Sequence, residues 1–384
     1  MTVAFFLILA LFFPKAAHAW DEADHQIITR LALEEVAPEW GLIEPCEVRP
    51  LQSFLNKIDG FKTKEAFSHF LKINPAIDLD HKEKSVLKRP TLSPLEILTF
   101  YSIDPDDGRD QDLPLISPDQ KWFGVTKGPD TQAFRHIEKP PFNVKDPINT
   151  FGFPFRSVGE ATRRAEIYEQ LSLLAFDVGE PYWGWRFLAG AFHYLEDLHN
   201  PYHAGQMTPA FAARGLRAYF SWGAKEKGFF GTMSHLVSNS HRFFETLVSF
   251  PPAPLRDAKQ SALEALRGRE VLSLDQTVWE IGRGVRDSSN RQFGKLITLV
   301  TEVSDPILFT PYRFRSWEAE RDDPARFLKK GAEKKEQEIF AIVQERFQSA
   351  GRVLRTVVQK SIQERRQRKS PKEILGKLEK LLDL

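Results

Sequence analysis

The sequence predicts an all-α protein, a compact multi-helix domain with a C-terminal helical extension. Six segments place apolar residues at three- and four-residue spacing, the pattern of a helix with one buried face. These segments are residues 25 to 36, 159 to 176, 182 to 198, 234 to 249, 272 to 300 and 332 to 364. We find no convincing two-residue alternation typical of half-buried strands. Residues 90 to 154 are rich in proline, glycine and aspartate and predict a long loop region.

Composition allows a sizeable core and indicates no strongly charged partner. The chain has 384 residues, of which 42% are hydrophobic, and its formal net charge is only +1. A charge this balanced does not favour nucleic acid or an anionic membrane as a partner of the whole molecule. Cys46 is the only cysteine, which excludes a disulfide within the chain.

The first nineteen residues have features of a secretory signal peptide. An apolar run covers residues 3 to 13, and Ala17-His18-Ala19 fits the small-residue pattern of a cleavage site. The run is shorter than the ~20 residues that span a bilayer. An uncleaved anchor stays open as an alternative, since no Lys or Arg precedes the run. We expect residues 1–19 to be removed, so that the mature protein begins at Trp20 and is periplasmic or secreted.

We place a boundary near residue 306, between a main helical domain of residues 20–305 and a charged extension of residues 306–384. From residue 311 to the end, nineteen Lys or Arg face twelve Asp or Glu. One apolar helical stripe runs through this part of the chain. We interpret it as a helix packed on the main domain with a solvated basic face. A helix that docks onto a partner or a membrane is the alternative.

Histidines and acids occur together at helical spacing. His193 and Asp197 are four residues apart and therefore lie on one face of a helix, and His203 follows on the next turn of chain. His241 and Glu245 form a second pair with the same spacing. One such pair is usually a salt bridge, but this combination favours a metal site. Imidazole nitrogen and carboxylate oxygen without a thiolate suit catalytic zinc.

Together with the segment Trp20-Asp-Glu-Ala-Asp-His25, these pairs resemble the bacterial zinc-dependent phospholipases C and the related single-strand-specific zinc nucleases. The resemblance covers roughly residues 20 to 250. It implies that a mature N-terminal Trp20 binds zinc through its free amine and carbonyl, and that His25 completes that site. It also implies an upstream Asp and His, best matched by Asp106 and His136. Asp104, Asp107 and Asp110 lie close enough to replace Asp106.

The family scheme implies about three zinc ions, with Asp106 as the catalytic group that accepts a proton from the attacking water. Asp197 would bridge the first and third ions. The implied ligands are Asp106, His136, His193 and Asp197 for the first ion, His203, His241 and Glu245 for the second, and Trp20 with His25 for the third.

The resemblance implies an exported zinc-dependent phosphodiesterase, phospholipase C-like, that acts on a phospholipid. Glu245 and the turn Asn200-Pro201-Tyr202-His203 resemble the phospholipase branch. A nuclease or nucleotidase of the same fold, acting on a nucleic-acid or nucleotide phosphate ester, is one alternative. A non-catalytic helical binding protein is the other. We expect no obligate protein partner, and peripheral membrane contact stays open.

Overall fold

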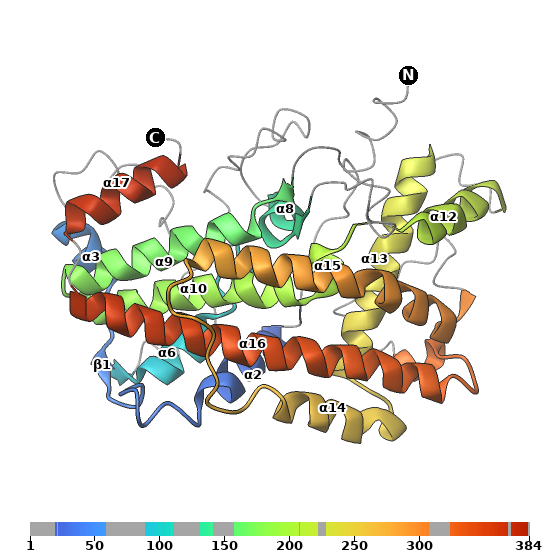
Figure 1. Cartoon of the computed structure of the whole chain (residues 1–384), viewed down its shortest axis with the longest axis horizontal. Coiled ribbons are helices and arrows are strands. Elements are labelled where there is room, and N and C mark those ends of the chain that lie inside the picture. The colour runs from blue at the N-terminus through green and yellow to red at the C-terminus, as the bar shows by residue number, and fades with distance from the viewer. Residues whose placement is uncertain are drawn as a thin grey trace.

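The protein is all-α, as the sequence predicts, in a computed structural model (Figure 1). The structure describes residues 20, 22–58, 89–108, 110, 131–140, 157–206, 208–221, 228–306, 323–367 and 370–382. Within these residues, its α-helices are α2 (Glu22–Leu33), α3 (Leu51–Lys57), α6 (Pro94–Tyr101), α8 (Gln132–His136), α9 (Ala161–Asp177), α10 (Pro181–His199), α11 (Pro201–Ala204), α12 (Pro209–Ser221), α13 (Gly228–Ser249), α14 (Arg256–Glu264), α15 (Val278–Val303), α16 (Glu333–Gln367) and α17 (Pro371–Leu382). Short 3-10 turns cover Ala253–Leu255 and Pro324–Phe327.

Helix α10 forms the centre of the molecule. Almost every one of its side chains is buried, as expected for a helix surrounded by other helices. Its most extensive packing is against α9, and α15, α16, α6 and α2 cover the rest (Figure 1). Glycines permit the close approach of α9: a Cβ at Gly184 would lie 2.6 Å from the Phe176 ring, and one at Gly190 would lie 2.5 Å from the Tyr168 ring.

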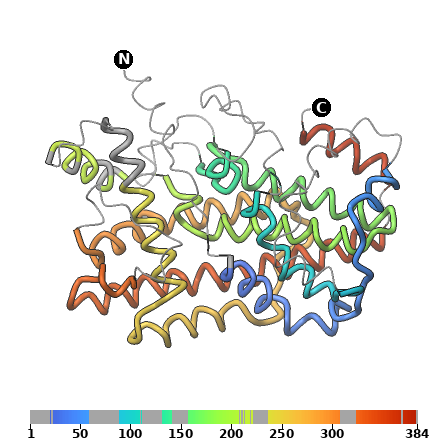
Figure 2. Tube along the Cα trace, turned by 180° about the vertical axis from the view of Figure 1, so that it is seen from behind, coloured from blue at the N-terminus to red at the C-terminus, as the bar shows by residue number. Residues whose placement is uncertain are grey.

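The C-terminal helices pack into the same core as the rest of the protein. Helix α16 contacts α2, α14 and α15, and its buried face includes Phe340, Phe347 and Leu354. Helix α17 lies on α9. Figure 2, seen from behind, shows α16 running along the whole length of the bundle. One core contains residues from both sides of residue 306. The expected division at this point stays a prediction.

Helices α15 and α6 show how observed helices differ in extent or place from the sequence prediction. Helix α15 begins only at Val278, because Thr277 and Glu280 form a capping box at its start. Helix α6 lies inside the predicted loop region, and Ser93 and Glu96 cap it in the same way. Capping signals therefore mark helix starts that apolar periodicity does not locate.

Sheet is confined to two short antiparallel pairs in the described residues. β1 (Cys46–Glu47) pairs with β2 (Thr91–Leu92), and β3 (Glu138–Lys139) pairs with β4 (Val158–Gly159). Gly159 has a φ of 94°, and a Cβ there would lie 2.0 Å from the Ile137 carbonyl oxygen. This close pairing ties the chain after α8 to the start of α9.

None of the described helices is long and apolar enough to cross a membrane. The predicted signal peptide, residues 1–19, lies outside the described residues.

Candidate metal centre

The predicted histidine, aspartate and glutamate ligands come together in the interior. They are contributed by α2, the turn after α6, α8, α10, α11 and α13. Eight side chains form three groups whose ligand atoms lie within 4.8 Å of one another, and each group could hold a metal ion. The groups are His25, Asp106 and His193; His136, His193 and Asp197; and His203, His241 and Glu245.

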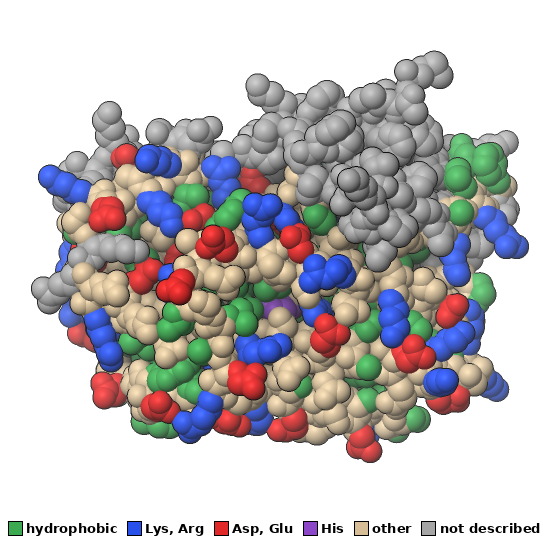
Figure 3. Space-filling model, in the orientation of Figure 1, with side chains coloured by type: hydrophobic (Ala, Val, Ile, Leu, Met, Phe, Trp, Pro, Cys, Tyr) green, Lys and Arg blue, Asp and Glu red, His purple; other side chains and the backbone are tan. Residues whose placement is uncertain are grey.

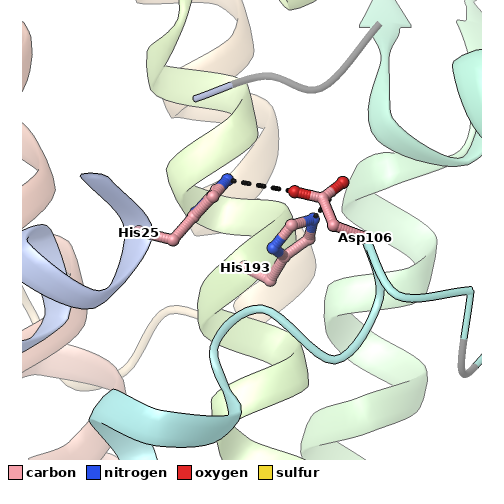
Figure 4. Close-up of side chains that lie close together, drawn as sticks. All are labelled: His25, Asp106 and His193. Atoms are coloured by element: carbon pink, nitrogen blue, oxygen red, sulfur yellow. Dashed lines mark ion pairs between the residues drawn. The ribbon is translucent and has the colours of Figure 1, made fainter. Parts of the chain in front are cut away.

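The first group joins three distant segments. His25 points from α2 and His193 from α10 toward Asp106, which lies in the turn that follows α6 (Figure 4). His25 Nε2 is 3.8 Å from Asp106 Oδ2, and His193 Nε2 is 3.7 Å from Asp106 Oδ1. All three side chains are fully buried. A carboxylate between two imidazoles is a set of hard and borderline donors that suits a divalent cation.

The second group is tighter. His193 Nε2 lies 2.9 Å from His136 Nδ1 and 3.4 Å from Asp197 Oδ2, and His136 Nδ1 lies 2.8 Å from the same oxygen. Ligand atoms on one tetrahedral zinc ion lie ~3.3 Å apart, given zinc–ligand bonds of ~2.0–2.2 Å. The observed spacings are close to that value, so this group fits such an ion with small adjustments.

The two oxygens of Asp197 face different histidines. Oδ2 faces His136 and His193, whereas Oδ1 lies 3.6 Å from His25 Nε2. Helix α10 therefore places one carboxylate between the first and second groups. This is the geometry that a bridging ligand requires.

The third group is the most accessible part of the centre. His241 Nε2 lies 2.7 Å from Glu245 Oε1, and their side chains are 7% and 14% exposed. The His203 ring centroid is 5.0 Å from that of His241. Asn200 positions this group twice: its side chain caps α11 by accepting from the Tyr202 N–H, and it donates to Glu245 Oε1 at 3.2 Å.

Hydrogen bonds on the far side of three rings aim their other nitrogens into the centre. Nδ1 of His193 contacts the Ser102 carbonyl at 2.7 Å, and Nδ1 of His203 contacts the His136 carbonyl at 2.7 Å. Nδ1 of His25 lies 2.5 Å from Glu196 Oε2. Each contact fixes a ring so that Nε2 faces inward, as second-layer acceptors do around metal-bound histidines.

Buried polar atoms provide a direct test of whether a metal fits. Among the described residues, His25 Nε2, His136 Nε2, His203 Nε2 and Asp197 Oδ1 are buried and make no hydrogen bond. Buried polar atoms are nearly always hydrogen-bonded, so such a cluster requires an explanation. All four belong to side chains of the metal-capable groups, and three of them, on His25, His203 and Asp197, point to a cation as their partner. His136 faces its group through Nδ1, and its Nε2 is not explained in this way.

Electrostatics favour neutral imidazoles at His136 and His203, whereas at His25 burial is outweighed by the hydrogen bond and charge of Glu196, so that its pKa is raised. Burial lowers the pKa of His203 to about 3 and holds the pKa of His136 well below its usual range. Burial, and after it the charge of Asp106, raises the pKa of Asp197. Neutral imidazole is the form that binds a metal, and a divalent cation would offset the repulsion between the two carboxylates.

Of the four acids considered upstream, only Asp106 belongs to a metal-capable group. Asp104 instead accepts from Arg186 Nε at 2.9 Å. Asp110 is buried with Arg135, Arg164 and Tyr194, and Arg164 Nη1 lies 2.6 Å from its Oδ2.

Trp20 lies beside the centre, although it belongs to no metal-capable group of the structure. Its indole Nε1 donates to the Glu196 carbonyl at 3.0 Å, and its ring contacts Phe244 and Phe347. The side chain is therefore anchored one residue from Asp197. The expected role of the Trp20 amine and carbonyl as ligands stays a prediction.

Sequence reasoning missed Glu196. It is buried on α10 and holds both His25 Nδ1 and the hydroxyl of Thr29, whose Oγ1 donates to Oε1 at 2.6 Å. The available signal was a second acid directly before Asp197, on a helix that contains no other Asp or Glu. His199 contacts the Leu195 carbonyl and Ser349 and belongs to none of the three groups.

Comparison of the chain with protein-family models, curated proteins and solved structures finds no match. Support for a function therefore comes from the geometry of the centre and from the motifs of the sequence.

Proposed function

We propose that the protein is a zinc-dependent phosphodiesterase of the phospholipase C and zinc-nuclease type, with about three zinc ions. The observation that carries the proposal is a single buried constellation of three metal-capable groups. Its donors are imidazole nitrogens and carboxylate oxygens without a thiolate, the set used by catalytic zinc. One ion would be held by Asp106, His136, His193 and Asp197, a second by His203, His241 and Glu245, and a third by Trp20 and His25 with Asp197 as a bridge.

When bound, closely spaced zinc ions supply an activated water and positive charge for the phosphate oxygens of an ester. The protein supplies the rest. Asp106, buried between His25 and His193, accepts the proton of the attacking water. Its neighbours exclude bulk solvent, which strengthens every charge interaction in the centre. Substrate approaches from the more accessible side, at His241 and Glu245.

We also propose that residues 1–19 are a signal peptide and that the mature protein, which begins at Trp20, is periplasmic or secreted. Support comes from the position of Trp20, which lies two residues before the start of the helix that carries His25 and is anchored to the backbone of Glu196. A free amine at this position would arise only after cleavage. N-terminal sequencing of exported, active protein tests this, and an intact Met1 on fully metal-loaded enzyme would contradict it.

A phospholipid is the substrate we favour, because Glu245 and the turn around His203 resemble the phospholipase branch. The test compares release of phosphocholine from a short-chain lecithin with hydrolysis of single-stranded DNA, using one zinc-loaded preparation. We expect the lecithin to be the better substrate. Faster cleavage of DNA would assign the protein to the nuclease branch. Bound zinc without turnover of either substrate would favour the non-catalytic binding protein. The Asp197→Asn variant serves as the background control in both assays.

A further inference from the structure

Helix α12 carries an unusual surface. Four large hydrophobic side chains are exposed among the described residues, and two of them, Leu216 and Phe220, lie one turn apart on α12. Leu216 is 42% exposed and Phe220 is 76% exposed. Figure 3 shows apolar side chains gathered at the end of the molecule where Figure 1 places α12. Exposed apolar patches of this kind mark interaction sites.

The opposite face of α12 packs against the rest of the protein, so the exposed residues are not needed to bury this helix. Phe211 and Gly215 are buried, and α12 packs on α13. Leu216 and Phe220 are four residues apart and so form a separate outward stripe. The helix is therefore apolar on two sides, whereas a helix that only covers a core is polar toward water.

The charged residues of α12 are all positive. Arg214 and Arg217 are exposed beside Leu216, and α12 contains no Asp or Glu. Tyr219 lies next to Phe220, with ring centroids 5.2 Å apart. Apolar and aromatic side chains rimmed by arginine are the composition of helices that lie in a membrane interface. Arginine stems also pack along apolar surface while their charged ends reach lipid phosphates.

We propose that the outer face of α12, formed by Arg214, Leu216, Arg217 and Phe220, docks the protein onto an anionic lipid surface. An aliphatic side chain as one of the two residues of the stripe favours lipid over single-stranded nucleic acid, because Leu216 offers no ring on which a base could stack. The absence of acids on α12 complements a negative surface. This docking is independent of the proposed hydrolysis, since none of these residues belongs to the metal centre.

Vesicle flotation with the full-length, metal-loaded protein tests the proposal, because flotation reports binding and not turnover. Vesicles of phosphatidylcholine are compared with vesicles that also contain phosphatidylglycerol. We expect binding to the mixed vesicles that weakens as salt is raised. The double variant Leu216→Ser/Phe220→Ser should lose roughly tenfold or more in affinity for both vesicle types, because two apolar side chains no longer enter the interface.

A second double variant separates the contribution of arginine charge to vesicle binding from that of apolar side chains entering the interface. Arg214→Gln/Arg217→Gln should weaken binding to the mixed vesicles by about thirtyfold, since each arginine near an anionic surface contributes ~1 kcal/mol. Its binding to pure phosphatidylcholine should stay unchanged. Phe250→Ser is the matched control, because Phe250 is 60% exposed but lies after α13, away from this face.

Three outcomes would overturn the proposal. The first is a wild-type protein that floats with neither vesicle, and the second is an equal loss in Phe250→Ser. The third is a pair of α12 variants that keep vesicle binding but lose self-association in light scattering or affinity for single-stranded DNA. That result would assign the stripe to a second copy of this chain or to nucleic acid instead.

Discussion

At the scale of single residues, Asp197 and Asp106 each face histidines with both oxygens, and Asp197 lies closer to its histidines than Asp106 does. The two oxygens of Asp197 face different histidines, His136 on one side and His25 on the other. Burial and the nearby Asp106 raise the pKa of its carboxyl group, so ionised Asp197 needs a compensating cation. We therefore expect the negative charge of Asp197, more than the shape of its side chain, to determine metal binding at the centre.

We therefore predict that Asp197→Asn loses at least one metal ion and nearly all activity. The variant keeps the size of the side chain but removes a negative charge shared by two groups. Asp104→Asn is the control: it loses an ion pair with Arg186 but should keep its metals, because Asp104 faces away from the groups. Metal content and turnover of both variants decide the matter. Full zinc content in Asp197→Asn would refute the bridging role.

Glu196 leads to a second prediction. Glu196→Ala removes the acceptor of His25 Nδ1 and of Thr29, so His25 loses its fixed orientation. We expect metal affinity at the His25 site to fall about 10–100-fold, the range seen when such supporting groups are removed. Glu196→Gln keeps one oxygen acceptor and should recover part of the affinity. Titration with zinc measures both. Equal affinities in all three proteins would show that Glu196 only fills space.

The ligand set illustrates how far sequence reasoning reaches at this scale. The pairs on α10 and α13 follow from four-residue spacing, because one helix face fixes both members of each pair. Asp106 could not be selected over Asp104 or Asp110 in this way, since the turn after α6 has no regular residue spacing that fixes where each side chain points. Its position depends on the packing of α6 against α10, which only the folded protein defines. Glu196 escaped for a similar reason, because its partner comes from α2.

At the scale of elements, the junction of α9, α16 and α17 contains an unexpected titrating group. Glu169 on α9 is buried, and burial followed by the charge of Glu364 on α16 raises its pKa to about 7. Gln170 donates to its Oε2 at 2.7 Å. In the unfolded chain the pKa of this group is near its ordinary value of 4.5. Ionised Glu169 is thus less stable in the folded protein than in the unfolded chain.

The sign of the pH dependence follows. Below about pH 4.5 Glu169 is protonated in both the folded protein and the unfolded chain, so it has no effect on the free energy of unfolding. Between about pH 4.5 and 7 the unfolded chain releases the proton first, and the stability of the folded protein falls. Glu169→Gln should therefore stabilise the protein by ~3 kcal/mol at about pH 8 and by little at about pH 4. Thermal melts across this range measure the difference. Exposed Glu373→Gln on α17 is the control, and an equal gain there would exclude the proposed cause.

Long helices were the predictable elements, and short connections were not. The periodic segments correspond to α2, α9, α10, α13, α15 and α16, because each helix buries one continuous face over several turns. Helices α6 and α8 lie in the segment predicted as loop, where proline and aspartate are frequent. They are too short for periodicity to identify, and tertiary contacts stabilise them.

At the scale of the whole molecule, the centre connects parts of the chain that are far apart in sequence. His25 on α2 and Glu245 on α13 are separated by more than two hundred residues, and α10 joins them through His193 and Asp197. Without a cation, this interior concentrates carboxylates and imidazoles, and some of their described polar atoms, such as His203 Nε2, make no hydrogen bond. Such an arrangement costs stability that metal binding restores.

The last prediction concerns this coupling. A chelator should remove activity and also lower the melting temperature, because an unfolded chain does not present these ligands together and metal-binding free energy becomes folding free energy. At free zinc about a hundredfold above the dissociation constant, each site would add ~2.7 kcal/mol. Melts of wild type and Asp197→Asn, each with and without chelator, measure it. Wild type should shift by several degrees, and Asp197→Asn, already short of metal, should shift less. An unchanged wild-type melting temperature would mean that the buried histidines and acids satisfy one another without a metal.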